Sequence, residues 1–268
     1  HTWLRRQRQM CIRDRSKGSP NLDDLDLNPL FVQADPGKNK RYCEKPIINE
    51  VPDTLDQKIW PEVENLIDNN SPLDKTYEIK NTDRAVGTRI SYHLYKKFGN
   101  NKLEENTFSL NFKGSAGQSF GAFGIKGLKL ILKGDANDYV AKGLSGASVI
   151  VKLPEESNLV SNENTIIGNT VLYGATSGTL LAAGQAGERF AVRNSGATAV
   201  VEGCDSNGCE YMTGGSIVIL GDVGDNFGAG MTGGMAFVYD PKNEFTKKVN
   251  PETIIWQTPE TAFWNCLL

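Results

Sequence analysis

Few residues in this chain have types and spacings suited to chemistry. Cys204 and Cys209 are separated by four residues, a spacing compatible with two ligands of a zinc ion or an iron–sulfur cluster. Either site needs further thiolates or imidazoles, and the two histidines of the chain, His1 and His93, are distant in the sequence. We therefore interpret the two cysteines as buried or half-buried thiols in a loop, and His93 as a structural residue of an amphipathic helix.

The segment GAGMTG, with Gly228, Gly230 and Gly233, matches the G-x-G-x-x-G fingerprint of dinucleotide-binding sites. That fingerprint works where it links a strand to a helix, because the helix N-terminus holds the pyrophosphate. Here a strand-like apolar run, MAFVY, comes directly after it. Nucleotide binding is therefore not predicted, and these glycines are interpreted as chain corners.

The densest polar cluster lies in the segment GERFAVRNSGA. Its charged and amide residues are Glu188, Arg189, Arg193 and Asn194. Charged residues in a tightly packed repeat usually pair with one another or with backbone carbonyls. The alternative is a binding role for the two arginines, as a contact with another domain, and the sequence leaves both interpretations open.

All of these residues except His1 and His93 lie in a glycine-rich stretch from Gly114 to Asp240, which holds 24 of the 28 glycines. Six short apolar runs start at residues 128, 147, 179, 197, 216 and 235, with spacings of 19, 32, 18, 19 and 19. Such a period is typical of stacked coils whose strands pair in parallel. The predicted fold class is all-β, a single-stranded parallel β-helix of about six to seven coils. Its corners are assigned to glycines, which adopt positive φ without strain: Gly143, Gly146, Gly174, Gly187, Gly196, Gly215, Gly221 and Gly234.

Aligning the six runs by their starts predicts which side chains face the interior. One predicted inner column is Leu130, Val149, Leu181, Ala199, Val218 and Phe237. The second is Leu132, Val151, Ala183, Val201, Leu220 and Tyr239. The column between them, predicted to face outward, is Ile131, Ile150, Ala182, Val200, Ile219 and Val238. Strands that are apolar on both faces are covered on both faces, so we expect a further segment or domain to cover the outer column.

The remainder of the chain is assigned from composition and local pattern. Residues 1–15 carry five arginines against one acid and are interpreted as a non-native leader, with a basic nucleic-acid-binding arm as the alternative. Residues 16–110 are expected to form an irregular and helical lead-in, with helices at 55–69 and 85–98, the first capped by Thr54 and the second by Gly99. The β-helix is assigned to 111–240 and a truncated tail to 241–268.

Neither a nucleic-acid partner nor a membrane partner is predicted. No apolar run approaches the roughly 18 residues that a membrane span needs. The five cysteines form no even disulfide framework, which favours a reducing, cytoplasmic setting.

Several long strings, in the same order, resemble one known domain. They are GSAGQSFGAF, GDANDYVAKGLSG, IIGNTVLYGAT, AGERFAVRNSGA, EYMTGG and NFGAGMTGG, with VNPE at 249 and NTDRAVGTRIS at 81. Together they resemble the carboxy-terminal domain of the large subunit of glutamate synthase, which in that family is a right-handed parallel β-helix. The complete family enzyme converts glutamine and 2-oxoglutarate, with a reductant, into two glutamates. It uses a cysteine amidotransferase domain and an FMN-binding barrel with an iron–sulfur cluster.

The resemblance implies a structural role for this chain. None of the family's catalytic residues has a counterpart in it, so no catalytic, cofactor-binding or metal-binding residue is assigned, and FMN and the cluster are expected in other parts of the complete enzyme. The implied partners are the amidotransferase and FMN-binding domains of the same polypeptide, with a small reductase subunit as a further candidate. The alternative is a free-standing β-helix subunit of a multi-subunit redox complex. Ala141 and Ala147 stand where the family usually has glycine, and we expect ordinary backbone angles at both.

Overall fold

The computed structural model describes residues 37–38, 40, 52–69, 73, 75–99 and 103–259. The chain divides into two units, His1–Val51 and Pro52–Leu268. In the first unit only residues 37, 38 and 40 are described, so the predicted leader lies outside the described residues. The regular architecture is that of the second unit. No helix in the described ranges is long and apolar enough to cross a membrane.

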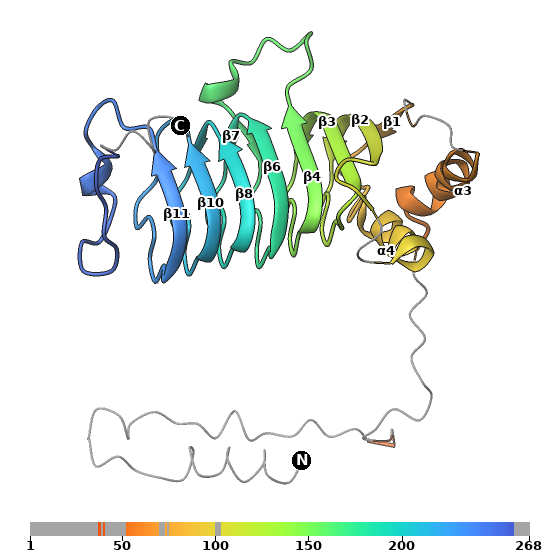
Figure 1. Ribbon diagram of the computed structural model, residues 1–268, viewed down its shortest axis with the longest axis horizontal. Coiled ribbons are helices and arrows are strands. Elements are labelled where there is room, and N and C mark those ends of the chain that lie inside the picture. The colour runs from red at the N-terminus through yellow and green to blue at the C-terminus, as the bar shows by residue number, and fades with distance from the viewer. Residues whose placement is uncertain are drawn as a thin grey trace. The chain divides into compact units, whose positions relative to one another are not determined.

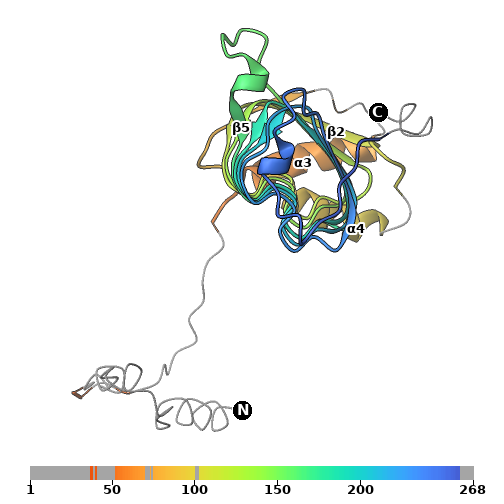
Figure 2. The same cartoon turned by 90° about the vertical axis from the view of Figure 1, so that its left-hand side faces the viewer.

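The second unit is a parallel β-solenoid of about seven turns. Its long strands lie side by side in one sheet (Figure 1), and they are β2 (Phe108–Ala116), β3 (Leu128–Ala136), β4 (Ser145–Lys152), β6 (Ser177–Ala183), β8 (Ser195–Val201), β10 (Thr213–Ile219) and β11 (Gly233–Val238). Short strands stack along a second side: β5 (Thr165–Ile167), β7 (Gln185–Ala186) and β9 (Gly203–Cys204). Figure 2 looks along the stack and shows the coils overlapping in one ring. The predicted parallel β-helix is confirmed.

Two ladders of apolar side chains fill the inside of the long sheet. The first consists of Leu110, Leu130, Val149, Leu180, Ala199, Ile217 and Ala236. The second consists of Phe112, Leu132, Val151, Ala182, Val201, Ile219 and Val238. All of these residues are buried except Ala236 and Val238 in the terminal strand β11, which are partly buried. Each strand therefore contributes two residues to a continuous core.

The predicted register was wrong by one residue in three of the six runs. Leu181, Val218 and Phe237 face outward, and their neighbours Leu180, Ile217 and Ala236 face inward. In the second column, Ala182, Ile219 and Val238 likewise replace Ala183, Leu220 and Tyr239. Thr179 pairs with Ser148, and Ser216 pairs with Thr198, so the starts of the runs are not equivalent positions. Aligning the runs by their starts therefore displaces the runs at 179, 216 and 235 by one residue. A one-residue slip in register turns every side chain of a strand to the other face. Because both faces of these strands are apolar, the sequence does not reveal such a slip.

The outer side of the same strands is also apolar. Paired residues Ile131, Ile150, Leu181, Val200, Val218 and Phe237 form a column that we call the sheet face. All six are partly or fully exposed, and Leu181 retains 39% of its accessible surface. Towards β11 the apolar surface widens, because Leu220, Met235 and Tyr239 are exposed beside it. The predicted apolar outer column is therefore present, with Leu181, Val218 and Phe237 in place of Ala182, Ile219 and Val238.

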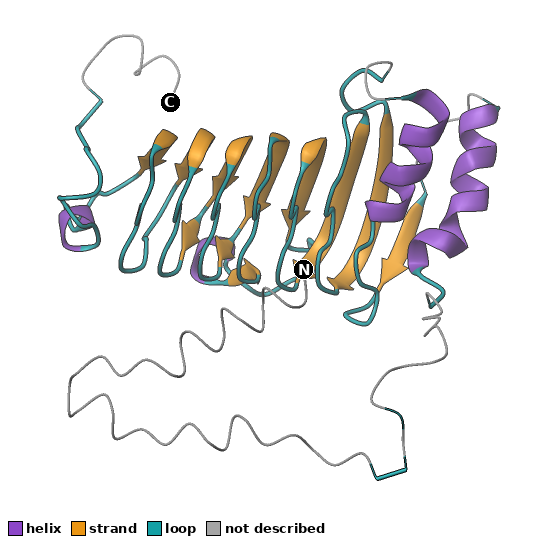
Figure 3. Ribbon diagram, turned by 90° about the horizontal axis from the view of Figure 1, so that it is seen from below, coloured by secondary structure: helices purple, strands orange, loops and turns teal. Residues whose placement is uncertain are grey.

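Two helices and a short strand cover the β2 end of the solenoid (Figures 1 and 3): α3 (Leu55–Asp68), β1 (Thr76–Ile79) and α4 (Thr88–Phe98). Both predicted helices are confirmed, with Thr54 forming a capping box with Gln57 and Gly99 donating its N–H to the carbonyl of Tyr95. Helix α4 begins three residues later than predicted, because Ala85 and Gly87 have φ of 52° and 96°. His93 stacks on Trp60 with the ring centroids 4.5 Å apart, a structural contact between the two helices.

The carboxylate of Asp56 joins these two helices. It is buried, and it accepts hydrogen bonds from the backbone N–H groups of Gly87 (2.9 Å), Arg89 (2.8 Å) and Ile90 (3.2 Å) at the start of α4. Burial raises the pKa of Asp56 above its usual value, and the three N–H donors offset only part of that rise. A side chain from α3 therefore supplies the cap that Gly87, at the N-terminus of α4, does not provide.

An arm and a terminal segment depart from the regular coils. Residues 153–164, with the turn η2 (Ser161–Glu163), project from the solenoid between β4 and β5 and account for the 32-residue spacing (Figures 1 and 2). Salt bridges Lys113–Glu156 (2.6 Å) and Lys133–Glu155 (3.9 Å) hold the base of the arm. At the other end, η3 (Phe245–Lys247) lies over the last coil, where the rings of Phe245 and Phe227 are 5.6 Å apart.

Candidate functional site

Six coils share a corner in which three alternating residues have a left-handed backbone. The φ angles at these positions i, i+2 and i+4 lie between 52° and 72°. The first positions are Ser119, Tyr139, Thr170, Arg189, Asn207 and Asn226. The second positions are Gly121, Ala141, Leu172, Ala191, Cys209 and Gly228. The third positions are Phe123, Gly143, Gly174, Arg193, Tyr211 and Gly230. We call this feature the left-handed corner.

Backbone hydrogen bonds hold the corners of successive coils in register. Examples are Tyr139 N–H to the carbonyl of Asn169 (2.9 Å) and Arg193 N–H to the carbonyl of Glu210 (2.9 Å). The alternation directs the second position inward, where all six residues are buried, and the first and third positions outward. Outward side chains of successive coils consequently stack on one edge of the solenoid.

Most corner positions carry a side chain, although glycine would fit them with less strain. A left-handed backbone costs a residue with a side chain about 1–2 kcal/mol, and glycine avoids that cost. In this corner only Gly121, Gly143, Gly174, Gly228 and Gly230 are glycines. The prediction for Ala141 was wrong, since its φ is 56°; the hydrogen bond from its N–H to the carbonyl of Phe120 (2.8 Å) keeps it in the ladder. Ala147 is not among the residues with positive φ.

The eight glycines predicted at corners fall into two groups. Positive φ angles occur at Gly143, Gly146, Gly174, Gly215 and Gly234. The other three lie against an oxygen of the preceding coil, so that an added Cβ would be 2.3 Å from Asn169 Oδ1 at Gly187, 2.2 Å from the carbonyl oxygen of Thr176 at Gly196, and 2.3 Å from that of Glu202 at Gly221. Coil spacing, as well as backbone angle, therefore requires glycine.

Of the predicted polar cluster, the structure brings Arg189 and Arg193 to the surface of the corner. Arg189 Nε donates to Glu210 Oε2 at 2.8 Å, joining two coils. The guanidinium carbon of Arg193 lies 5.8 Å from the centre of the Tyr211 ring in the next coil. Glu188 is exposed, and its backbone carbonyl accepts from Thr170 N–H at 2.8 Å.

Asn194 is separated from the other three residues and has a structural position. It is fully buried, donates from Nδ2 to the carbonyl of Ala197 (2.9 Å) and accepts at Oδ1 from the N–H of Ala197 (3.0 Å). These bonds close the turn into β8. The cluster is thus split between a surface pair of arginines and an internal amide.

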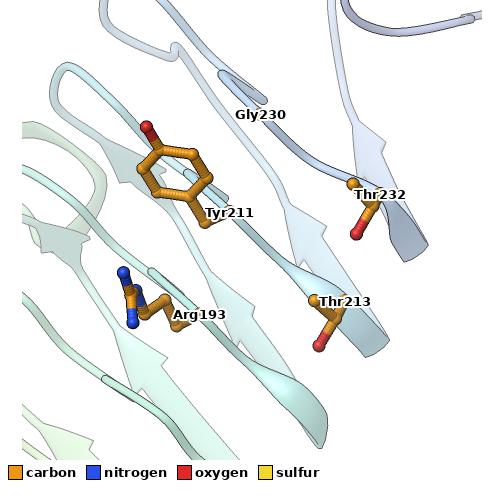
Figure 4. A pocket seen from close by; sticks show the side chains of 5 residues that line it. All are labelled: Arg193, Tyr211, Thr213, Gly230 and Thr232. Atoms are coloured by element: carbon orange, nitrogen blue, oxygen red, sulfur yellow. The ribbon is translucent and has the colours of Figure 1, made fainter.

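An open pocket of about 330 Å³ lies beside Arg193 (Figure 4). Its lining residues are Arg193, Tyr211, Thr213, Gly230 and Thr232. The Tyr211 ring lies over Gly230, where an added Cβ would come within 2.5 Å of the ring. Among the salt bridges of the described residues none involves Arg193, whereas Arg189 is paired with Glu210. The pocket therefore combines a guanidinium beside an aromatic ring with two threonine side chains at a solvent-facing edge.

Further aromatic and basic side chains extend this edge toward α4. Lys142 Nζ lies 5.5 Å from the ring centre of Tyr139 and 5.9 Å from that of Tyr173. Phe123 is 53% exposed and Tyr211 51% exposed. The outer surface of the left-handed corner therefore carries aromatic and cationic side chains, whereas the sheet face is mostly aliphatic.

The remaining residues considered for chemistry have structural positions. Cys204 and Cys209 are free, buried thiols, and burial raises the pKa of Cys204 to about 12 and that of Cys209 well above its usual value. Gly228 and Gly230 lie in the last left-handed corner, directly before β11, rather than before a helix. Within the described ranges no group of three or more His, Cys, Asp or Glu residues is placed to hold a metal ion.

Comparison with known proteins identifies the repeat. The family described as "GXGXG motif" matches residues 56–265. The chain belongs to the GXGXG-motif family. The alternation of left-handed positions explains the spacing in that description, because i, i+2 and i+4 are the positions where glycine removes strain. The resemblance to the β-helix domain of the glutamate synthase large subunit is confirmed.

Related proteins in this family are glutamate synthases. Over 253 residues the chain is 56% identical to the glutamate synthase [NADPH] large chain of Azospirillum brasilense, covering 94% of this chain and 17% of that protein. It is 47% identical over 236 residues to ferredoxin-dependent glutamate synthase 2 of Synechocystis sp., covering 87% of this chain and 15% of that protein. For glutamate synthase [NADH] of Schizosaccharomyces pombe the identity is 48% over 251 residues, covering 91% and 12%. The chain therefore spans less than a fifth of the length of these relatives.

The sequence interpretation missed the left-handed corner as a site. Its signal was a pair of glycines two residues apart, Gly228 and Gly230, with Gly143 and Gly174 at the equivalent third position of other coils. The pair was assessed as a nucleotide fingerprint and then as a simple corner. Arg193 and Tyr211 gave no such signal, because side chains at left-handed positions are uncommon outside glycine, asparagine and aspartate.

Proposed function

We propose that this chain is the structural scaffold domain of a glutamate synthase large chain. The complete protein would convert glutamine, 2-oxoglutarate and a reductant into two glutamates, and this domain would hold the amidotransferase and FMN-binding domains in place without contributing catalytic residues. FMN and an iron–sulfur cluster would be bound by those other parts. Support comes from the names of the relatives and from the fact that the chain covers only 12–17% of their lengths.

The observation that carries this proposal is the sheet face. Six strands at about 4.8 Å spacing give an apolar column roughly 24 Å long. It continues into exposed Leu220, Met235 and Tyr239. Contiguous apolar surface of this kind marks an interaction site, and a parallel sheet is normally covered on both faces. A scaffold whose interior is complete and whose outer face is apolar is suited to seating another domain.

Electron-donor choice is not expected to reside in this domain. Relatives named for NADPH, NADH and ferredoxin match the chain with 56%, 48% and 47% identity, so similarity in this region does not separate the donors by kind. A small reductase subunit is a further proposed partner of the complete protein, outside the surfaces described above.

The experiment replaces two residues of the sheet face in the complete large chain. Ile150→Glu with Val200→Glu places charges where an apolar partner surface would lie, while both side chains point away from the core. We expect glutamine-dependent glutamate formation to fall at least about tenfold, because seating a domain on two carboxylates carries a desolvation cost. Lys58→Glu, an exposed change on α3, is the control and should leave activity unchanged.

The same pair of substitutions is made in the chain of 268 residues alone. Its melting temperature should change little, which separates loss of assembly from loss of folding. Full activity of the doubly substituted complete protein would contradict the scaffold proposal.

A further inference from the structure

We propose that the pocket formed by Arg193, Tyr211, Thr213 and Thr232 binds a carboxylate carried by an acidic segment elsewhere in the same, larger polypeptide. This inference rests on the proposed scaffold function and adds a second contact, on a different side of the coils from the sheet face. It concerns the left-handed corner, whose role the sheet face does not explain.

The first argument is the backbone conformation. Arg193 and Tyr211 have φ of 54° and 52°, and the equivalent third position is glycine in three other coils, at Gly143, Gly174 and Gly230. Glycine would remove the strain at both sites. Strain alone does not distinguish these two residues, because most corner positions carry a side chain, but it makes Arg193 and Tyr211 candidates for a functional requirement at outward positions.

The second argument is pre-organisation of the cation. The absence of a side chain at Gly230 leaves room for the Tyr211 ring, and the guanidinium carbon of Arg193 lies 5.8 Å from the centre of that ring. Figure 4 shows Arg193 and Tyr211 on one side of the pocket and Thr213 and Thr232 on the other, on neighbouring coils. The planar fork of a guanidinium is pre-organised, so it loses little freedom for each hydrogen bond it forms, and it matches a carboxylate in a bidentate manner.

The third argument is the contrast between the two arginines. Arg189 is already paired with Glu210 at 2.8 Å, so its charge is satisfied within the chain. Arg193 has no salt bridge among the described residues, although it lies only four positions further along. Hydroxyl groups of Thr213 and Thr232 line the same pocket and provide further hydrogen-bond donors.

The openness of the pocket favours a tethered carboxylate over a free one. A single exposed arginine–carboxylate pair in water is weak. Tethering raises the effective concentration of the carboxylate to the millimolar range or above, which makes a weak contact useful. The relatives are six to eight times longer than their matched region, since that region is 12–17% of their lengths, so the polypeptide has ample chain to provide such a segment.

The test uses Arg193→Lys in the complete large chain, treated with a carbodiimide. The reagent joins an amine to a carboxylate in contact with it as an amide, and takes up the released water to become a urea. We expect the introduced amine to be linked to an Asp or Glu outside the 268 residues, identified by mass spectrometry of the peptides. Arg189→Lys is the matched control, and its amine should link to Glu210 within the chain.

Two outcomes would overturn the proposal. One is a link from position 193 only to carboxylates within residues 103–259, or no link at all while the control links to Glu210. The other is saturable binding of succinate to the 268-residue chain at about 10 mM or below that is lost in Arg193→Gly, which would assign the pocket to a free carboxylate. If position 193 gives no link outside the 268 residues while the Ile150→Glu, Val200→Glu protein is inactive, the pocket contact is rejected and the scaffold function is still supported.

Discussion

The sheet face and the left-handed corner belong to the same coils and are built in opposite ways. The sheet face is made of regular strands whose outer residues are mostly aliphatic, such as Ile150 and Val200. The corner is made of left-handed residues, and its outer side chains include aromatic and cationic groups such as Tyr211 and Arg193. Regular strands place no demand on residue type beyond size and polarity, whereas the corner demands a backbone that most residues adopt only at a cost.

This difference determines how each region responds to substitution. On the sheet, the two sides of a strand differ by a single residue along the chain, so neighbouring substitutions should have very different effects. At the corner, the left-handed backbone angle determines the cost of a substitution, so adding a methyl group should lower stability even where no atom lies in its way. Three sets of substitutions, in order of decreasing effect on stability, separate these two kinds of control.

The largest effect is expected for Ile217→Asp in β10. Ile217 is fully buried between Ala199 and Ala236, so an unpaired carboxylate would enter the core and lower the free energy of unfolding by about 3–5 kcal/mol. Val218→Asp, one residue away, places the carboxylate on the sheet face and should cost about 1 kcal/mol or less. Urea unfolding of both variants provides the measurement, and equal losses would show that the inward register is wrong.

An intermediate effect is expected for Gly174→Ala at the corner. Gly174 has φ of 65°, and no other atom lies within 4 Å of an added Cβ, so the loss of about 1 kcal/mol would come from the backbone angle alone. Thr170→Gly in the same coil is the reverse test, because Thr170 has φ of 59° and its β-branched side chain is ill suited to it. Its stability should rise by up to about 1 kcal/mol after the entropy of glycine is deducted. An unchanged unfolding midpoint for Gly174→Ala would remove strain as the distinguishing property of the corner.

The smallest effect on folding is expected for Ile150→Thr with Val200→Thr on the sheet face. Threonine keeps the β-branched shape and is well accepted in strands, so the unfolding free energy should change by no more than about 1 kcal/mol. Self-association of the 268-residue chain should fall, since its apolar surface is smaller. Analytical ultracentrifugation of both proteins gives the comparison. If the unsubstituted chain stays monomeric at high concentration, the sheet face does not drive self-association and this prediction is wrong.

The same contrast explains what the sequence could predict. The period of the apolar runs predicted the parallel β-helix, since stacked coils repeat their strands at a constant spacing. The inward register could not be fixed in every coil, because Leu180 and Leu181, or Ile217 and Val218, are interchangeable by hydrophobicity. Pairing across coils, with a shift before Ser216, decides between them.

The candidate site was predicted less completely than the fold. Arg189 and Arg193 were singled out as a polar cluster, but the sequence did not indicate that Glu210 neutralises only the first. The approach of Arg193 to Tyr211, 18 residues later, depends on the coil spacing, and the position of the Tyr211 ring depends on the absence of a side chain at Gly230. Ala141 was expected to have ordinary angles because alanine disfavours a left-handed backbone, yet the ladder of backbone hydrogen bonds outweighs that preference.

The most direct test of the scaffold role is the accessibility of Val200 in two settings. Val200→Cys places a thiol in the middle of the sheet face, while Cys204 and Cys209, the two native cysteines within the described residues, are buried and have raised pKa values. The alkylation rate with a maleimide is measured peptide by peptide in the 268-residue chain and in the complete large chain, each relative to its rate in denaturant. We predict rapid labelling in the isolated chain and labelling slower by about tenfold or more in the complete protein, since a seated domain excludes the reagent. Equal rates in the two proteins would contradict the claim that the sheet face seats the rest of the synthase.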